Sequence, residues 1–222
     1  MKTEIKKILV IDVGGTNLKI HVTGQREPVK VPSGPRMTAA RMAAAVEKIS
    51  RGWQFDAVSI GFPGPVKNNR PMREPHNLGG GWMKFDFKKF FGRPVKIIND
   101  AAMQALGSHV GGRTLFLGLG TGLGSAIVMD GALLPLELAH LPYKKNKTYE
   151  QYLGEAALKK SGKKRWRKDV ADVVELLRNA LLADTVVLGG GNARLIKNFP
   201  EGVVAGKNMN AFTGGERLWK NS

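Results

Sequence analysis

The 222-residue sequence contains no cysteine, which excludes disulfide bonds and thiolate metal ligands. It also lacks any apolar run of about eighteen residues, the length that a membrane-spanning helix requires. The segment Met1–Lys7 is short and polar, unlike the apolar stretch of a secretory signal peptide. From these absences we expect a cytoplasmic protein, and the length allows one large domain or two small ones.

Acidic residues are scarce: 18 Asp and Glu stand against 35 Lys and Arg, for a formal net charge of +17. Such a charge attracts polyanions, which include nucleic acid, anionic membranes and polyphosphate. The segment Lys144–Lys168 carries ten of the cations and only two acids, Glu150 and Glu155. A solvated basic surface and a polyanion contact explain this segment equally well. Trp166 within it offers a stacking surface for a base, but no nucleic-acid motif accompanies it.

Two familiar nucleotide-binding motifs are missing, because the sequence has neither G-x-x-x-x-G-K-[ST] nor a G-x-G-x-x-G that opens a helix. Instead, two Gly-Thr hairpins occur, L-V-I-D-V-G-G-T-N-L-K-I-H-V at Leu9–Val22 and L-F-L-G-L-G-T-G-L-G-S-A-I-V at Leu115–Val128. Glycine lets backbone N–H groups approach a ligand closely, and successive N–H groups form an anion-binding concavity. The pair predicts two phosphate-binding lobes and favours phosphoryl transfer.

The apolar patterns predict alternating strands and helices that repeat in the same order, and therefore an α/β fold with internal duplication. We expect two lobes, residues 1–100 and 101–222, with a hinge near Asp100–Gly111. In the second lobe, a capping box of Thr148 and Gln151 predicts one helix, and Asp169 is expected to cap the next. A further helix is expected from Ala193, whereas the tail from Pro200 has little periodicity and is interpreted as irregular.

The first glycine turn contains groups that phosphoryl transfer requires. Asp12 offers a carboxylate for Mg²⁺, held through water, while Gly14 and Gly15 offer backbone contacts. Thr16 adds a hydroxyl and Lys19 a positive charge. The second hairpin has Gly118 at the position of Asp12, and this asymmetry favours a functional role for Asp12 over that of an ordinary turn residue.

Further polar residues occur at strand ends and in glycine- or leucine-rich settings. Asp100 ends an apolar strand and opens a helix, which places its carboxylate at the edge where ligand crevices of α/β sheets lie. A helix cap is an equally good explanation for Asp100. Together with Asn77, Glu137 and His140, it supplies the functional groups that bind a polyhydroxyl substrate.

The motifs D-x-G-G-T-x-x-K, G-F-P-G, N-L-x-G-x-W, I-N-D-A, G-x-G-T-G-x-G, E-L-x-H-L and L-G-G-G resemble, in this order, those of the ROK-family sugar kinases. The resemblance runs from Ile8 to about Asn192. The segment Lys147–Leu158 resembles the corresponding segment of the polyphosphate glucokinases within the family. In those proteins this segment lacks the zinc-binding cysteines that many other members carry. The resemblance implies the two-lobed ribonuclease H-like fold of the actin/hexokinase/Hsp70 superfamily with an interdomain cleft, no zinc site, and association into a homodimer.

The resemblance also implies a reaction, the phosphorylation of glucose or a similar hexose at O6 with Mg²⁺ and with polyphosphate and/or ATP as donor. Asp100 would be the general base, and polyphosphate would contact Lys144–Lys168; no membrane or nucleic acid is expected as a partner. The implied sugar ligands are Asn77, Asn99, Glu137, His140 and Glu150. The implied donor-binding residues are Asp12, Gly14, Gly15, Thr16, Lys19, Gly120, Thr121 and Gly122, with Gly189, Gly190 and Gly191 against the base or ribose of ATP.

Two positions depart from the family pattern, Ala139 in place of Gly in E-x-G-H and Ala102 in place of Asn in N-D-A-N. Because alanine needs more clearance than glycine, an altered sugar specificity is one consequence to consider. Two other functions remain open at this point. One is an ATP-dependent ROK kinase for mannose or an N-acetylhexosamine, and the other is a non-catalytic sugar- or polyanion-binding protein.

Overall fold

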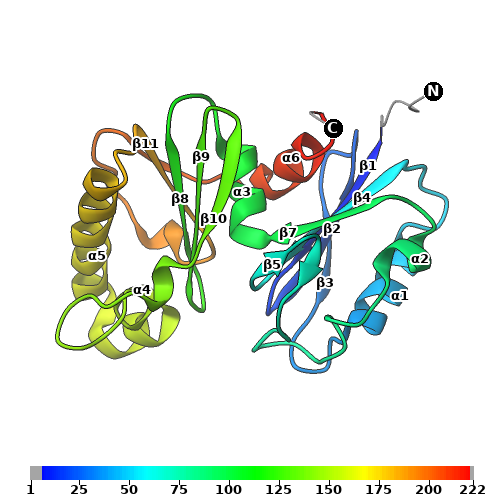
Figure 1. The fold of residues 1–222 in the computed structure, drawn as a ribbon. Helices are drawn as coiled ribbons and strands as arrows, with labels where there is room; N and C mark the ends of the chain where they lie inside the picture. The colour runs from blue at the N-terminus through cyan, green and yellow to red at the C-terminus, as the bar shows by residue number, and fades with distance from the viewer. Residues whose placement is uncertain (1–6, 221–222) are drawn as a thin grey trace. The chain divides into compact units, whose positions relative to one another are not determined.

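The computed structural model describes residues 7–220, which divide into two compact units (Figure 1). Unit 1 takes in the chain up to Met103 and again from Ala211 onwards, and unit 2 is Gln104–Asn210. The first boundary lies inside the expected hinge. The second boundary differs from the expected division, because the C-terminal segment belongs to unit 1. Each unit contains one five-stranded sheet with a glycine hairpin, which confirms the α/β fold with duplication.

The sheet of unit 1 has the strand order β3-β2-β1-β4-β7. β1 pairs antiparallel with β2 and parallel with β4, so the first glycine turn lies at one end of the central strand. A small β5–β6 hairpin interrupts the long loop that follows β4. The strands are β1 (Ile8–Val13), β2 (Asn17–Val22), β3 (Val29–Pro32), β4 (Ala57–Phe62), β5 (Val66–Lys67), β6 (Arg70–Pro71) and β7 (Val95–Asn99).

Alternate residues of β1 face opposite sides of this sheet. Leu9, Ile11 and Val13 pack in a core with helix α1 (Ala39–Ile49), whose first turn is capped by the Thr38 side chain. The fully buried Trp82 joins the same core and lies against Phe62 and Phe87, the latter in α2 (Phe87–Phe91). This packing anchors the loop before α2, which carries Asn77.

The other face of the sheet is covered by helix α6 (Asn210–Arg217) from the C-terminal segment that the sequence pattern predicted to be irregular. That prediction is wrong. The fully buried Ser59 of β4 donates its hydroxyl to Gly215 O at 2.7 Å and accepts a hydrogen bond from Trp219 Nε1 at 2.9 Å. Phe212 lies 4.9 Å from the His21 ring between centroids. A short, glycine-containing helix has little apolar periodicity, so only its contacts with the sheet identify it.

Replacing Ser59 by alanine tests this attachment. We expect Ser59→Ala to lower the free energy of unfolding by about 1–3 kcal/mol, because the buried Gly215 O and the partly buried Trp219 Nε1 each lose their hydrogen bond. Urea unfolding followed by tryptophan fluorescence measures the change. Ser161→Ala is the control, since that exposed hydroxyl bonds only to Ala157 O of its own helix and its removal should change stability by less than about 0.5 kcal/mol. Equal losses in the two variants would contradict the prediction.

The sheet of unit 2 has the order β10-β9-β8-β11-β12 and repeats the antiparallel glycine hairpin in β8 and β9. Helix α5 covers one face through Val170, Val173, Val174 and Leu177. The strands are β8 (Thr114–Leu119), β9 (Leu123–Met129), β10 (Ala132–Leu136), β11 (Thr185–Gly189) and β12 (Val203–Ala205). Helix α3 (Asp100–Ser108) begins in unit 1 and ends in unit 2. The other helices of unit 2 are α4 (Glu150–Leu153), α5 (Glu155–Ala180) and two 3-10 turns, Leu138–His140 and Ala193–Leu195.

Helix α5 differs from its prediction. The Thr148–Gln151 capping box is present, but Asp169 caps nothing: it lies inside α5, is 4% exposed, and binds Arg165 one turn earlier. The helix begins upstream of Asp169, because five of the six residues 163–168 are Lys or Arg, which are good helix formers. The helical backbone is interrupted at Gly162, which has φ of 75°. Trp166 is fully buried and donates to Leu153 O, so it offers no stacking surface for a base. The helix expected from Ala193 is a single 3-10 turn.

None of the helices in residues 7–220 is both long and apolar enough to cross a membrane.

Candidate functional site

The first glycine turn, between β1 and β2, is held in place through its carbonyl groups. Gly14 N donates to Asn17 O at 3.0 Å, while Ser33 donates its hydroxyl to Gly14 O and its backbone N–H to Thr16 O. The N–H groups of Gly15 and Thr16 donate to no acceptor in the described part of the chain. Two consecutive N–H groups on a fixed turn form an anion-binding arrangement. Ser33 was not among the predicted site residues, because nothing in its P-S-G-P setting distinguishes it from an ordinary turn.

The second glycine turn, between β8 and β9, repeats this arrangement. Leu119 O accepts from Asn192 N at 2.9 Å, and Gly120 O accepts from Glu155 N at 3.1 Å and from Asn192 Nδ2 at 3.3 Å. Within residues 7–220, the N–H groups of Thr121 and Gly122 have no acceptor. They occupy the positions that correspond to Gly15 and Thr16 in the repeat. The duplication seen in the sequence therefore extends to the unpaired donors.

The glycine-rich segment Gly189–Gly191 lies against this second turn. Gly190 has φ of +82°, and a side chain there would overlap the backbone of Leu119. Asn192, directly after the segment, donates its backbone N–H to Leu119 O and its side-chain Nδ2 to Gly120 O. Unit 2 therefore brings together two groups of the predicted donor-binding glycines.

Asp12 lies at the end of β1, is 6% exposed, and pairs with Lys19 across the hairpin at 2.9 Å. The described residues contain no cluster of three or more His, Asp or Glu that would hold a metal ion by itself. Mg²⁺ commonly keeps several waters and is held by one or two carboxylates together with substrate phosphates. A single carboxylate beside an anion-binding turn fits that pattern, so Asp12 is suited to hold Mg²⁺ only together with a donor.

Asn77 is exposed and lies beside the first turn, since a Cβ on Gly15 would be 3.2 Å from the Cβ of Asn77. Its loop is fixed by Glu74, which accepts from the backbone N–H of Trp82 at 3.0 Å. The structure thus places this predicted sugar ligand next to predicted phosphate ligands within unit 1.

Asn99 and Asp100 lie where β7 passes into α3. Asn99 Oδ1 accepts from Ala102 N at 3.0 Å, and its Nδ2 donates to Gly64 O at 3.2 Å. Asn99 therefore caps the helix and ties it to the G-F-P-G turn. The half-buried Asp100 accepts a hydrogen bond from Ala101 N at 2.8 Å and lies in the first turn of α3. A helix N-terminus stabilises a carboxylate there.

Glu137 precedes the 3-10 turn after β10 and His140 is the last residue of that turn, with 3.8 Å between Glu137 Oε2 and His140 Nε2. Both side chains are more than half exposed and are available to a ligand. Ala139 between them is 3% exposed and belongs to the core of unit 2, and Ala102 is fully buried. The two alanines that depart from the family pattern therefore bury their methyl groups in protein.

Glu150 does not lie in a polar cluster of its own but against the second glycine turn. Its Oε2 accepts from Leu123 N at 3.3 Å. The structure therefore associates this predicted sugar ligand with the predicted phosphate turn of unit 2.

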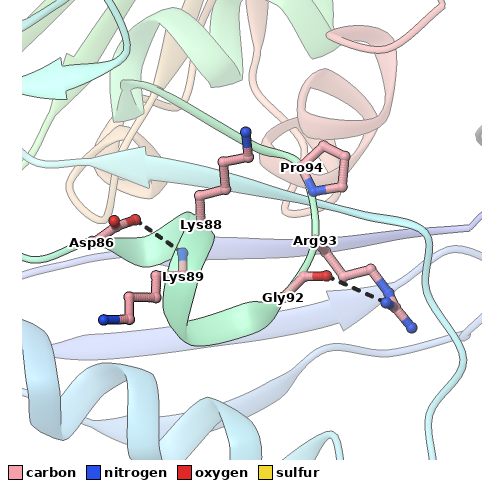
Figure 2. Close-up of a pocket in the computed structure, with 6 residues that line it drawn as sticks. All are labelled: Asp86, Lys88, Lys89, Gly92, Arg93 and Pro94. Carbon is pink, nitrogen blue, oxygen red and sulfur yellow. Dashed lines mark hydrogen bonds between the residues drawn. The ribbon is translucent and has the colours of Figure 1, made fainter.

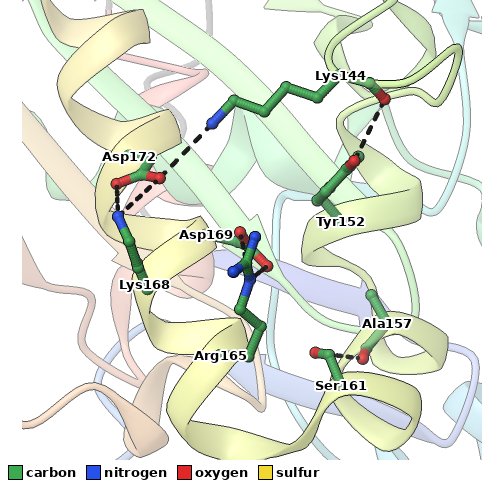
Figure 3. Close-up of polar contacts among 8 residues, drawn as sticks. All are labelled: Lys144, Tyr152, Ala157, Ser161, Arg165, Lys168, Asp169 and Asp172. Atoms are coloured by element: carbon green, nitrogen blue, oxygen red, sulfur yellow. Dashed lines mark hydrogen bonds and ion pairs between the residues drawn. The ribbon is translucent and has the colours of Figure 1, made fainter.

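The basic segment Lys144–Lys168 contains paired and unpaired cations. Lys144 and Lys168 both bind Asp172, and Arg165 binds Asp169 (Figure 3). The Lys168 ammonium holds the pKa of Asp172 below its usual value, and contacts with Tyr143 and Asp172 raise the pKa of Lys144. In the described structure five exposed side chains form no ion pair: Lys145, Lys147, Lys160, Lys163 and Lys164.

Two surface hollows contain none of the predicted site residues. One, of about 520 Å³ in unit 1, is lined by α2 and the residues that follow it. Figure 2 shows that its cations Lys88, Lys89 and Arg93 point in different directions, so they do not converge on one anion. The other, of about 330 Å³ in unit 2, lies between α5 and the segment before β12. The candidate residues are therefore those of the turns and strand ends rather than of these hollows.

Comparison with known proteins identifies the family. The model of the ROK family matches residues 8–135, which include both glycine turns, Asn77 and Asp100. The chain belongs to the ROK family. It is 26% identical over 205 residues to the polyphosphate glucokinase of Mycobacterium tuberculosis, covering 83% of this chain and 77% of that relative.

Solved structures show the same fold. The inorganic polyphosphate/ATP-glucomannokinase of Arthrobacter sp. strain KM matches with a TM-score of 0.81 and 22% identity, over 96% of this chain and 98% of the other. A ROK-family glucokinase of Streptomyces griseus, determined in complex with glucose and AMPPNP, matches with a TM-score of 0.78 and 18% identity, over 96% and 99%. These matches confirm the expected fold class.

Proposed function

We propose that the protein is a hexokinase-type phosphotransferase that phosphorylates glucose at O6 with polyphosphate and/or ATP as donor. The observation that carries the proposal is the matched pair of glycine turns, each with two consecutive unpaired N–H groups, in a chain of the ROK family. An acidic residue in the first turn of α3 and a second at the end of β1 add the other groups that phosphoryl transfer requires. The names of the relatives agree with this assignment.

In the proposed reaction Asp100 accepts the proton of the sugar 6-hydroxyl as O6 attacks the terminal donor phosphorus. The O6–P bond forms, and the bond between that phosphorus and the leaving oxygen breaks. Asn77, Asn99, Glu137 and His140 would bind the other hydroxyls of the sugar. The N–H groups of Gly15, Thr16, Thr121 and Gly122 would bind phosphate oxygens, which stabilises charge in the transition state.

The remaining donor-binding residues would set the charge around the phosphates. Mg²⁺, when bound, neutralises negative charge on the donor, and Asp12 would hold it through water. The Thr16 hydroxyl and the Lys19 ammonium would add contacts at the first turn, with Gly14 allowing close backbone approach. Gly189–Gly191 would lie against the base or ribose when ATP is the donor.

Polyphosphate is the donor that the basic segment favours. The five unpaired lysines of Lys144–Lys168 offer a polyanion contacts that no carboxylate of the described chain already occupies. A contact of this kind weakens as salt is raised, because released counterions drive it. By the same argument, a short nucleotide donor such as ATP would not need contacts with this basic segment.

The first experiment measures glucose 6-phosphate formation with Mg²⁺ and either nucleotide-free polyphosphate or ATP. We expect product with polyphosphate and a rate that falls with ionic strength more steeply than the rate with ATP. Lys163→Gln/Lys164→Gln should raise the KM for polyphosphate several-fold, since two exposed cations are removed. The matched control is Lys88→Gln/Lys89→Gln in α2, which removes two adjacent lysines elsewhere. Equal KM values in the two double variants, or a flat response to salt, would contradict polyphosphate binding at this segment.

A second candidate function is phosphorylation of another hexose. The Arthrobacter structure is named a glucomannokinase, and mannose is therefore the first alternative substrate to test, followed by N-acetylhexosamines. A panel of these sugars with both donors distinguishes the alternatives. Binding of sugar without product from any combination would instead indicate a non-catalytic binding protein.

A further inference from the structure

The two glycine turns are each held through the same carbonyl group of the repeat. Gly14 of the first hairpin corresponds in sequence to Gly120 of the second. Gly14 O accepts a hydrogen bond from the Ser33 hydroxyl at 2.6 Å, and Gly120 O accepts one from Asn192 Nδ2 at 3.3 Å. Ser33 lies after β3 and Asn192 lies after β11, so each of these side chains comes from outside its hairpin. Two side chains of different chemistry therefore hold equivalent carbonyls.

Each of these carbonyls shares a peptide unit with one of the unpaired N–H groups. The carbonyl of Gly14 belongs to the same planar unit as the N–H of Gly15, and the carbonyl of Gly120 to the same unit as the N–H of Thr121. In a trans peptide the C=O and N–H bonds point in opposite directions. A hydrogen bond that fixes the carbonyl therefore fixes the direction of the N–H as well. Within residues 7–220 both N–H groups lack an acceptor, so they are available to a ligand.

The two peptide units differ in how easily they turn over, which requires coupled rotation about ψ of the residue before the unit and φ of the residue after it. The first unit has glycine on both sides, and glycine tolerates any φ that this rotation requires. The second unit precedes Thr121, a β-branched residue that rarely leaves negative φ. Gly120 O also keeps a second hydrogen bond, from Glu155 N at 3.1 Å, whereas in the described chain Gly14 O accepts only from Ser33. The first turn therefore depends more strongly on its side-chain hydrogen bond.

From this arrangement we infer that Ser33 and Asn192 are positioning residues for the phosphoryl donor. Each fixes one peptide unit so that its N–H faces a phosphate oxygen and its carbonyl faces away. A unit that has turned over would present a carbonyl oxygen to the phosphate, and two hydrogen-bond acceptors form no bond with each other. This inference rests on the proposed role of the glycine turns in donor binding, and it adds two residues that act on the donor only through the backbone.

The test is a titration with tripolyphosphate, without sugar or Mg²⁺, that follows the backbone ¹⁵N–¹H resonances of Gly15 and Thr121. Each resonance reports its own turn, so a separate Kd is obtained for each turn. Binding of the same anion to the basic segment shifts other resonances and is recorded apart from both.

Three alanine variants separate the side-chain bonds from general effects. Ser33→Ala removes the hydroxyl that holds the first turn. Asn192→Ala removes the amide that holds the second turn and keeps the backbone N–H that bonds to Leu119 O. The matched control is Ser108→Ala, which removes a half-buried hydroxyl that donates to Ala105 O at 3.0 Å within α3.

We expect Ser33→Ala to raise the Kd at Gly15 by about three- to tenfold, the usual contribution of one hydrogen bond, and to leave the Kd at Thr121 unchanged. Asn192→Ala should raise the Kd at Thr121 by about twofold at most, the low end of that contribution, because a backbone N–H still holds the carbonyl. Ser108→Ala should give the values of the unsubstituted protein at both turns. Ser33→Thr keeps the hydroxyl and should restore the Kd at Gly15.

Two results would show that Ser33 has no such role. One is an unchanged Kd at Gly15 in Ser33→Ala, and the other is an equal rise at Gly15 and Thr121, which indicates a general loss of structure. Ser33→Thr that binds as weakly as Ser33→Ala would also overturn the inference. Should Ser33→Ala not fold, which its spectrum shows directly, Ser33→Cys replaces the hydroxyl by a weak hydrogen-bond donor and must give the same weaker binding at Gly15.

The binding measurement separates this inference from the proposed function. Tripolyphosphate binding is measured without phosphoryl transfer, so a protein that forms no sugar phosphate still gives a Kd at each turn. Weaker binding at Gly15 after Ser33→Ala in an inactive protein would support the inference and contradict only the proposed reaction. Absence of binding at both turns of the unsubstituted protein would overturn the inference whatever the activity.

Discussion

Asp100→Asn is expected to lower kcat for glucose phosphorylation by about 10²–10⁴-fold, the usual contribution of a general base. The substitution keeps the size of the side chain and its ability to accept from Ala101 N, while it removes the group that takes the proton from O6. The KM for glucose should change little, because an amide still offers hydrogen bonds to a hydroxyl. Steady-state kinetics with glucose and the preferred donor measure both constants.

Asp130→Asn is the matched control for this prediction. Asp130 lies in the turn between β9 and β10 with φ of 51°, a conformation that asparagine adopts as readily as aspartate. We expect full activity from this variant. If Asp100→Asn keeps activity within a few-fold of the control, Asp100 is not the base, and its carboxylate then serves mainly the first turn of α3.

Asp12→Asn is expected to lower kcat/KM by about 10–100-fold at fixed Mg²⁺, the range typical of residues that act on a metal through an intervening ligand. The amide preserves the shape of the side chain but removes its charge, and the Lys19 ammonium then has no carboxylate to pair with. Raising the Mg²⁺ concentration should restore part of the activity, because the loss is one of metal affinity. Rates measured over a range of Mg²⁺ concentrations show this.

Asp172→Asn is the matched control for the Mg²⁺ dependence of Asp12→Asn. Asp172 also pairs with lysine, in its case Lys168 and Lys144, but it belongs to α5 and contacts neither glycine turn. Its replacement should leave the Mg²⁺ dependence unaltered. An identical Mg²⁺ dependence in Asp12→Asn and the unsubstituted protein would exclude a role for Asp12 in holding the metal.

Local sequence patterns predicted most of the elements that carry the candidate residues. Apolar strands on either side of Gly-Thr turns predicted the two hairpins β1–β2 and β8–β9, because the period-two pattern and the tight turn are both short-range features. The capping box at Thr148 was confirmed for the same reason. Asp169 was misread because a buried aspartate bound to Arg165 inside a helix has the same local sequence appearance as a helix cap.

Contacts between distant residues could not be predicted in this way. The sequence motif marks Gly122 and Glu150 separately, but their contact depends on how α4 packs beside the β8–β9 hairpin. The same holds for Ser33 and Asn192, which hold the carbonyls of the two turns and carry no motif of their own. Helix α6 was missed because its attachment to Ser59 depends on residues far apart in the chain.

The sequence by itself determined the α/β class, the duplicated glycine turns, the basic segment and the family, because each is recorded in local order and composition. The tertiary structure decided which carbonyls of the turns are bonded and which N–H groups are left unpaired. It also decided that Asp12 pairs with Lys19 and that Ser33 and Asn192 hold the equivalent carbonyls of the two turns. The physical reason is that the ion pairs and hydrogen bonds of a side chain depend on its neighbours in space. Those neighbours are brought together by the packing of elements that are distant in the sequence.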